Sequence, residues 1–167
     1  MRRLLLILLL AASAAAGERE RARHVLDRLA FGPRPGEVER VMALGVDRWI
    51  EQQLHPERIP DAKVEARVAP YDRKVKVPTR GEMREQRGEG RKVIADLSAQ
   101  RILRAAESER QLHEVMVDFW MNHFNVFAGK SLDRYLVTSY ERDTIRPRIW
   151  GSFEELLLAT AKSPAML

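Results

Sequence analysis

The chain has 167 residues, no cysteine and a formal net charge of +5. Without cysteine, an exported protein can form neither a disulfide framework nor a thiolate zinc site, and it has no cysteine nucleophile. Lysine and arginine alternate with acidic residues along most of the chain, which is typical of a mixed solvated surface, so we expect no nucleic-acid partner.

The first residues have the pattern of an export signal. Arg2 and Arg3 precede an apolar run from Leu4 to Ala12, and Ala14-Ala15-Ala16 offers a small-residue cleavage site. The apolar run is well below the roughly 20 residues that a spanning helix needs. We therefore expect a signal peptide at residues 1–16, a periplasmic or extracellular product, and no membrane span after cleavage. Loss of the two arginines would lower the formal charge to +3, and about 150 residues suffice for one domain.

The periodic segments predict helices and almost no strands. In residues 17–55, apolar positions recur at helical spacing, and Gly45 separates two short helices. Residues 56–90 are rich in proline, glycine and charge, which predicts a long polar loop. Such a loop is either a functional excursion or disordered, and its composition favours disorder. Residues 91–167 resume the helical period. The predicted fold is all-α, an irregular bundle of about six helices with a long polar loop.

One helix, expected from Ser108 to about Val126, carries most of the candidate chemistry. Ser108 with Gln111 fits a capping box, as do Ser152 and Glu155 before the last helix. At about 100° per residue, a polar stripe forms on the first of these helices, while its other faces are nearly all apolar. The stripe consists of Gln111, Glu114, Asp118, Asn122 and Asn125. Three alternatives are open for the stripe: exposure to water, an internal hydrogen-bond network, or a metal or acid–base site. The pattern favours exposure to water.

The candidate catalytic residues are His123, Asn122, Asp118 and Glu114, with His123 and Asp118 as weak candidates for metal ligands. The wheel places His113 and His123 on faces that protein should cover, which favours satisfied core histidines. Ten residues, or roughly 15 Å of helix, separate them, so they cannot bind one metal by themselves. No cofactor is indicated.

Three arginines cluster near Asp143 at the end of a later helix, which makes Arg142 and Arg146 weak candidates for anion binding. Cations in the last turn of a helix also meet its unsatisfied carbonyl groups, and this explanation is favoured because it requires no ligand.

The segments "HVLDRLAFGPRPGEVERVMALGVDRWIEQQL", "ERQLHEVMVDFWMNHFNVF", "YERDTIRP" and "GSFEELLLATAKSPAML" resemble a known family. It is the exported bacterial family called domain of unknown function 1800, and the resemblance covers the amino-terminal part of that family. It implies a mostly helical fold and no established activity. Many relatives have a second histidine where this chain has Met121, and they continue beyond the last segment. We therefore expect a helical core truncated at its carboxyl end, and a product that is prone to aggregate or depends on a partner.

Two classes of function follow. The first is a binding or assembly module of the bacterial envelope that acts with another exported protein. The alternative is an exported hydrolase-like enzyme with a site around Asn122 and His123. The sequence has no nucleophile elbow, phosphate loop, H-E-x-x-H or haem-attachment motif, and this favours the module.

Overall fold

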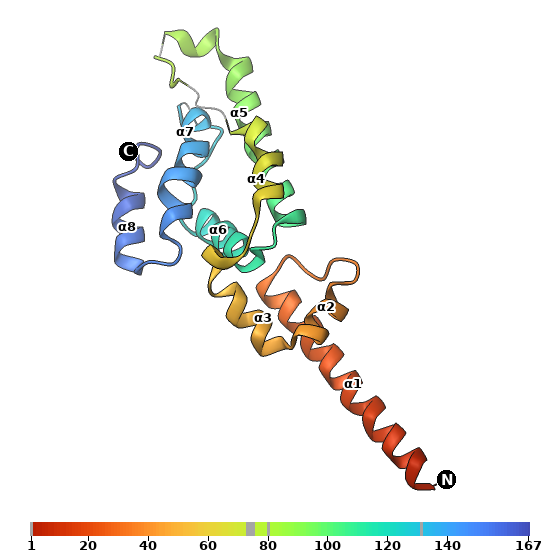
Figure 1. Ribbon diagram of the computed structural model, residues 1–167. Coiled ribbons are helices and arrows are strands. Elements are labelled where there is room, and N and C mark those ends of the chain that lie inside the picture. The colour runs from red at the N-terminus through yellow and green to blue at the C-terminus, as the bar shows by residue number, and fades with distance from the viewer. Residues whose placement is uncertain (1, 73–75, 80, 131) are drawn as a thin grey trace. The chain divides into compact units, whose positions relative to one another are not determined.

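The computed structural model describes residues 2–72, 76–79, 81–130 and 132–167 (Figure 1). These residues form eight α-helices and no strand, which confirms the all-α class. Within the same ranges, no helix has both the length and the apolar composition to cross a membrane. The helices are α1 (Arg2–Leu29), α2 (Glu37–Leu44), α3 (Val46–Gln53), α4 (Ala62–Val68), α5 (Arg87–Glu107), α6 (Gln111–His123), α7 (Asp133–Ser139) and α8 (Phe153–Ala161).

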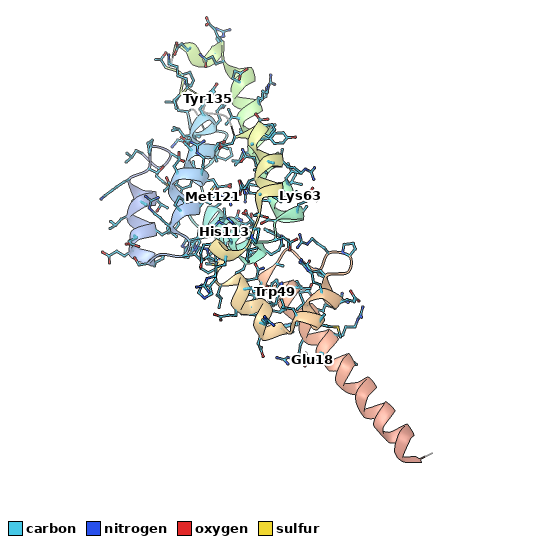
Figure 2. All side chains as sticks on the ribbon, in the orientation of Figure 1. Glu18, Trp49, Lys63, His113, Met121 and Tyr135 are labelled. Atoms are coloured by element: carbon cyan, nitrogen blue, oxygen red, sulfur yellow. The ribbon has the colours of Figure 1, made fainter. Side chains whose placement is uncertain are left out.

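The first compact unit comprises Met1–Pro60 and Arg110–Leu112. The apolar positions that recur at helical spacing in residues 22–30 are mostly buried and pack with α2 and α3. The core consists of Ala22, Val25, Leu26, Ala30, Val41, Val46 and Trp49. Trp49 is labelled in Figure 2. Gly45 separates α2 from α3 as predicted, because its φ of 92° ends α2 in a conformation that favours glycine. Helix α1 includes residues 2–16 of the predicted signal peptide and continues through residues 17–29. Cleavage of the signal peptide stays a prediction.

Hydrogen bonds that involve two buried glutamines and an arginine link residues 110–112 to the rest of the first unit. The Gln53 Oε1 atom accepts from the Leu112 amide at 3.1 Å, and Gln111 Oε1 accepts from the Phe31 amide at 3.2 Å. Arg110 Nε donates to the Ile59 carbonyl at 2.8 Å. The bond to Leu112 satisfies an amide that the first turn of α6 leaves without an intrahelical partner.

The second unit comprises Asp61–Glu109 and His113–Leu167, and α5 packs against both α4 and α7. Its core is formed by Leu97, Val117, Met121, Val126, Val137, Tyr140, Ile145, Ile149, Leu156 and Ala165. The capping box predicted at Ser152 and Glu155 is present at the start of α8. It satisfies two backbone amides that the first turn would otherwise leave free.

The prediction of one polar loop over 56–90 is wrong for its first part. Helix α4 lies there, and Val64 and Val68, one turn apart, are both 2% exposed. Buried Asp61, just before α4, accepts hydrogen bonds from the Ser108 hydroxyl at 2.7 Å and the Glu109 amide at 3.0 Å. These bonds tie the start of α4 to the end of α5, so tertiary contacts order a segment of low apolar content. Residues 73–75 and 80 of the predicted loop lie outside the described residues.

Candidate functional site

Helix α6 begins at Gln111 and ends at His123, so it is shorter at both ends than predicted. Its polar stripe is only partly exposed to water. Gln111 and Glu114 are buried, at 1% and 6% exposure, whereas Asn122 and Asn125 are exposed. The expectation that water covers the whole stripe is therefore wrong for its amino-terminal half, where the second alternative, an internal polar network, is found.

Glu114 lies at the centre of this network. Its two carboxylate oxygens accept from Arg146 Nη1 at 2.7 Å and from Nη2 at 3.0 Å, which is the bidentate geometry of a strong guanidinium–carboxylate pair. Arg146 Nη2 also donates to Glu141 Oε1 at 2.8 Å. Arg104 Nη1 lies 3.9 Å from Glu114, and Arg101 Nε lies 3.8 Å from Glu141. We call Arg101, Arg104, Glu114, Glu141 and Arg146 the buried ion-pair network.

A π-helical turn from Tyr140 to Ile145 brings two members of the network together. In an ideal α-helix, Glu141 and Arg146 would point about 140° apart, since they are five residues apart at about 100° each. The wider turn has i to i+5 hydrogen bonds, and it places both side chains on the face toward α6. π-turns often occur at functional sites, but here the turn serves an internal ion pair. The helical periodicity of the sequence could not reveal it.

The charges of the network hold Arg146 in its cationic form. Burial by itself would lower the pKa of this guanidinium, but the hydrogen bonds and negative charges of Glu114 and Glu141 raise it above its usual range. Arg146 therefore stays paired with both carboxylates. Both oxygens of Glu114 accept hydrogen bonds and its side chain is buried, so it lacks the access that a general base or metal ligand needs.

Asp118 and Asn122 continue the stripe toward the exposed end of α6. Asp118 pairs with Arg101, and its Oδ2 accepts from Asn122 Nδ2 at 3.1 Å. The Asn122 amide also donates to the Asp118 carbonyl at 2.9 Å. Asp118 thus has a cation and an amide from this chain on its carboxylate, and Asn122 is positioned along its own helix.

His123 is exposed, which contradicts the prediction that protein covers it. Its ring stacks on Phe119 at 5.9 Å between ring centroids and meets Trp120 and Phe124 edge-on at 5.5 and 4.8 Å. Phe153, at the start of α8, extends this cluster and lies 6.0 Å from Trp120 and 6.2 Å from Phe124. We call Phe119, Trp120, His123, Phe124 and Phe153 the aromatic face.

The other histidine of α6 has a structural role. His113 Nδ1 accepts a hydrogen bond from Trp150 Nε1 at 3.0 Å, and this contact positions the ring. This contact agrees with the expectation of a histidine satisfied by protein. The same expectation fails for His123, whose side chain is exposed.

The two arginines considered for anion binding are occupied by carboxylates of this chain. Arg142 pairs with Asp143 at 2.7 Å and with Asp72 at 2.9 Å, and these bonds raise the pKa of its guanidinium. Among the described residues, the guanidinium groups of Arg142 and Arg146 hydrogen-bond to carboxylates and not to helix-terminal carbonyls, so the explanation favoured by the sequence is wrong for both. Arg148 does, since its Nη1 donates to the carbonyls of Asp143 and Thr144 at 2.8 and 2.9 Å.

Across the described ranges, no group of three or more His, Asp or Glu side chains has the spacing to hold a metal ion. His123 and Asp118, the weak metal candidates, are one and a half turns apart on α6 and have separate partners. The sequence analysis missed Phe153, which joins the aromatic face because the start of α8 brings its ring near Trp120 and Phe124. The exposed apolar start of "FEELLLATA" was the available signal.

Comparison with known proteins gives one match. A family model described as "Protein of unknown function (DUF1800)" matches residues 24–167. No curated protein and no solved structure matches the chain.

Proposed function

The chain belongs to the DUF1800 family of proteins of unknown function, and we propose that it is an exported binding module of the bacterial envelope. The observation that carries the proposal is the aromatic face. Phe119 is 54% exposed and Phe153 is 56% exposed, although both rings belong to one contiguous cluster. A contiguous exposed apolar patch on a folded domain is typical of an interaction site.

The patch has the geometry to bind a helix. On α6, Phe119 and His123 are four residues apart, and on α8 the exposed residues Phe153, Leu157 and Ala161 repeat the same spacing. Rows of this kind are the ridges against which a further helix packs. The matching partner is an amphipathic helix with apolar anchors at positions i, i+3 or i+4, and i+7.

Charge at the edge of the patch narrows the chemistry of this partner. Glu154 follows Phe153, is exposed, and has no hydrogen bond or ion pair among the described residues. A lysine or arginine beside the apolar row of the partner would complement it. The same acidic group disfavours an anionic lipid surface as the occupant. We therefore propose an amphipathic helix with a basic flank, presented by another exported protein.

The geometry favours this module over a hydrolase. The alternative enzyme would use His123 with Asp118 or Glu114, but both carboxylates are paired with arginines. The ring of His123 contacts aromatic side chains instead. Its exposed nitrogen atoms can donate or accept a hydrogen bond at the interface, which adds specificity to an otherwise apolar surface.

In-cell photo-crosslinking tests the proposal. A photoreactive phenylalanine analogue at Leu157 should give one discrete crosslinked product, and the same analogue at exposed Ala66 on α4 should not. Mass spectrometry should place the crosslink in an amphipathic helix with a basic flank. A peptide of that helix should bind the full chain, and Phe119→Ser should weaken binding about tenfold or more, as expected for an aromatic anchor. Ile102→Ser is the matched control, since Ile102 is apolar and 69% exposed but outside the aromatic face.

Several results would contradict the proposal. Crosslinks to lipid, to a second copy of this chain or to an extended segment would identify another occupant. Equal losses from Phe119→Ser and Ile102→Ser would show that the aromatic face has no special role. Hydrolysis that is lost on His123→Gln and retained by Phe119→Ser would favour the enzyme.

A further inference from the structure

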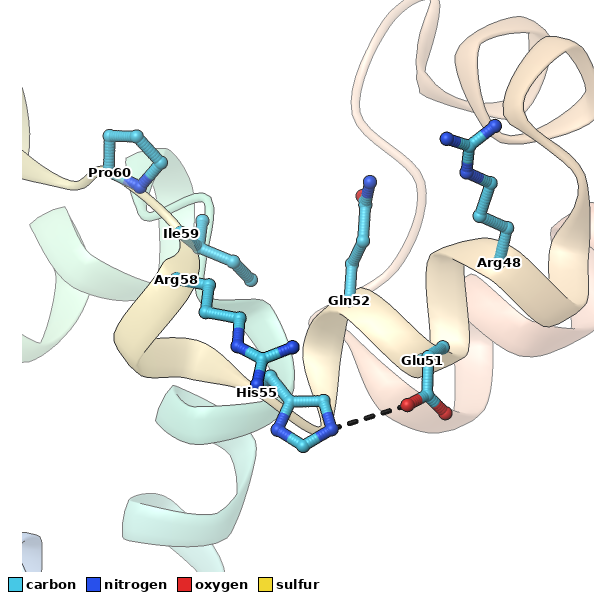
Figure 3. Close-up of a pocket in the computed structure, with 7 residues that line it drawn as sticks. All are labelled: Arg48, Glu51, Gln52, His55, Arg58, Ile59 and Pro60. Atoms are coloured by element: carbon cyan, nitrogen blue, oxygen red, sulfur yellow. Dashed lines mark hydrogen bonds and ion pairs between the residues drawn. The ribbon is translucent and has the colours of Figure 1, made fainter.

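A separate pocket lies in the first unit, between the outer face of α3 and the segment that follows it. It has a volume of about 450 Å³ and is lined by Arg48, Glu51, Gln52, His55, Arg58, Ile59 and Pro60 (Figure 3). The first four residues recur at helical spacing along one face, and the last three come from the turn after α3. The volume is in the usual range for small-ligand sites, roughly 300–1,000 Å³.

The polar groups of the pocket are only partly satisfied by the protein. The side chains of Arg48 and Gln52 have no hydrogen bond or ion pair among the described residues. Most other arginines of this unit are paired: Arg19 with Glu39, Arg21 with Glu18, Arg23 with Asp27, and Arg34 and Arg40 with Glu37. Arg48 differs from these in that its guanidinium lines a cavity and has all five donors available.

His55 and Arg58 are held in place by carboxylates. His55 Nε2 lies 3.2 Å from Glu51 Oε1, the contact drawn in Figure 3, and its Nδ1 lies 3.4 Å from Glu57. Arg58 contacts Glu57 through Nε, also at 3.4 Å, and this leaves the two terminal nitrogens of its guanidinium without a protein partner in the described chain. The terminal nitrogens of Arg58 are therefore available to a ligand, while its Nε contacts Glu57.

From these residues we propose that the pocket binds a small carboxylate that carries an apolar side chain, such as an N-acylated amino acid or the carboxyl terminus of a short peptide. A guanidinium fork matches the two oxygens of a carboxylate. Gln52 provides an amide that can pair with an adjoining peptide group, and Ile59 and Pro60 provide apolar surface for the side chain.

The charge balance favours a monoanion over a dianion. The lining residues contribute two guanidinium groups and the carboxylate of Glu51. A second carboxylate, that of Glu57, contacts Arg58. A single negative charge can pair with the unpaired Arg48. A phosphate dianion would bring a second charge toward Glu51 and Glu57, where repulsion opposes it. This site is independent of the aromatic face and does not rest on the function proposed for it.

The probes are N-acetyl-leucine, its uncharged analogue N-acetyl-leucinamide, and inorganic phosphate, each titrated into the full isotope-labelled chain and followed by amide chemical shifts. N-acetyl-leucine should give saturable shifts at residues 48–59. Arg48→Met should weaken that binding about tenfold or more, since a charge-assisted hydrogen bond is lost. Arg28→Met is the matched control, because Arg28 is also exposed and without a described partner but lies outside the pocket.

The amide analogue separates carboxylate recognition from apolar contact, and phosphate tests the class of anion. Weaker binding of both analogues than of N-acetyl-leucine supports the proposal. It is overturned if N-acetyl-leucine causes no saturable shifts, if the uncharged amide binds equally well, or if phosphate binds more tightly. Equal weakening by Arg48→Met and Arg28→Met would also overturn it, because only nonspecific attraction would then remain. Circular dichroism of each variant confirms that the helices are intact.

Discussion

Replacement of Arg146 by methionine should destabilise the second unit substantially. Methionine keeps much of the length of the side chain, but Glu114 and Glu141, each with a side chain 6% exposed, lose their shared guanidinium. Removal of one partner from a buried ion pair typically costs about 3–5 kcal/mol. Arg104 and Arg101 remain at 3.9 and 3.8 Å from the two carboxylates and offset part of this loss. We therefore expect the lower end of the range, about 3 kcal/mol.

Urea unfolding followed by circular dichroism measures this change. With a slope of about 2 kcal/mol per molar urea, a loss of about 3 kcal/mol lowers the midpoint by about 1.5 M. This is a large part of the roughly 5–15 kcal/mol that stabilises a typical domain. Arg146→Lys should cost less than the methionine variant, because it keeps the positive charge but loses the bidentate fork.

Arg142→Met is the matched control, since it makes the same substitution four residues earlier, within the π-helical turn that Arg146 follows. Arg142 pairs with exposed carboxylates of Asp72 and Asp143, and exposed pairs contribute only about 0–1 kcal/mol. If Arg146→Met costs no more than Arg142→Met, burial does not amplify the ion pairs and the reasoning about the network is refuted.

Three further predictions concern other parts of the chain. Tyr140 donates to the Phe124 carbonyl at 2.8 Å, and burial raises the pKa of Tyr140 to about 12 from an ordinary value of 10.0. In the unfolded chain the phenol loses its proton at a lower pH than in the folded protein. The contribution of Tyr140 to the free energy of unfolding is therefore complete below pH 10 and is lost as pH rises through about 12. Denaturant titrations at a series of pH values should show this loss in the wild type but not in Tyr140→Phe. For Glu37, burial alone would raise the pKa, but hydrogen bonds from Arg34 and Arg40 outweigh it and lower the pKa. Glu37→Gln should therefore lower the free energy of unfolding by about 1–3 kcal/mol at pH 7. The difference in this free energy between the variant and the wild type should shrink as pH falls through the lowered pKa of Glu37. A difference that is constant with pH would contradict this. Finally, mass spectrometry of periplasmic or secreted protein should find an amino terminus near Gly17, and an intact Met1 on cytosolic protein would contradict export.

Local sequence patterns were sufficient where the chain itself contains the whole cause of the structure. Gly45 ends α2 because only glycine adopts its positive φ readily, and Ser152 with Glu155 closes a capping box within four residues. The periodic apolar row of residues 22–30 is buried as expected. In the first two cases the cause lies within a few residues of the chain. In the third the period marks the buried face, although residues of α2 and α3 cover it.

Long-range contacts decided the rest. Glu114 and Asn122 belong to one polar stripe, yet Glu114 is buried and Asn122 is exposed. The burial of Glu114 depends on its ion pair with Arg146, which lies 32 residues further along the chain. Helix α4 forms inside the predicted loop because Val64 and Val68 are buried by the rest of the unit. Asp61, just before α4, also accepts a hydrogen bond from Ser108, which lies 47 residues further along the chain. The sequence by itself determined the helical class, most of the helices, and which positions are apolar or charged, but not helix α4. The tertiary structure alone decided which polar groups meet a partner and which rings remain exposed, because burial depends on neighbours that no local period encodes.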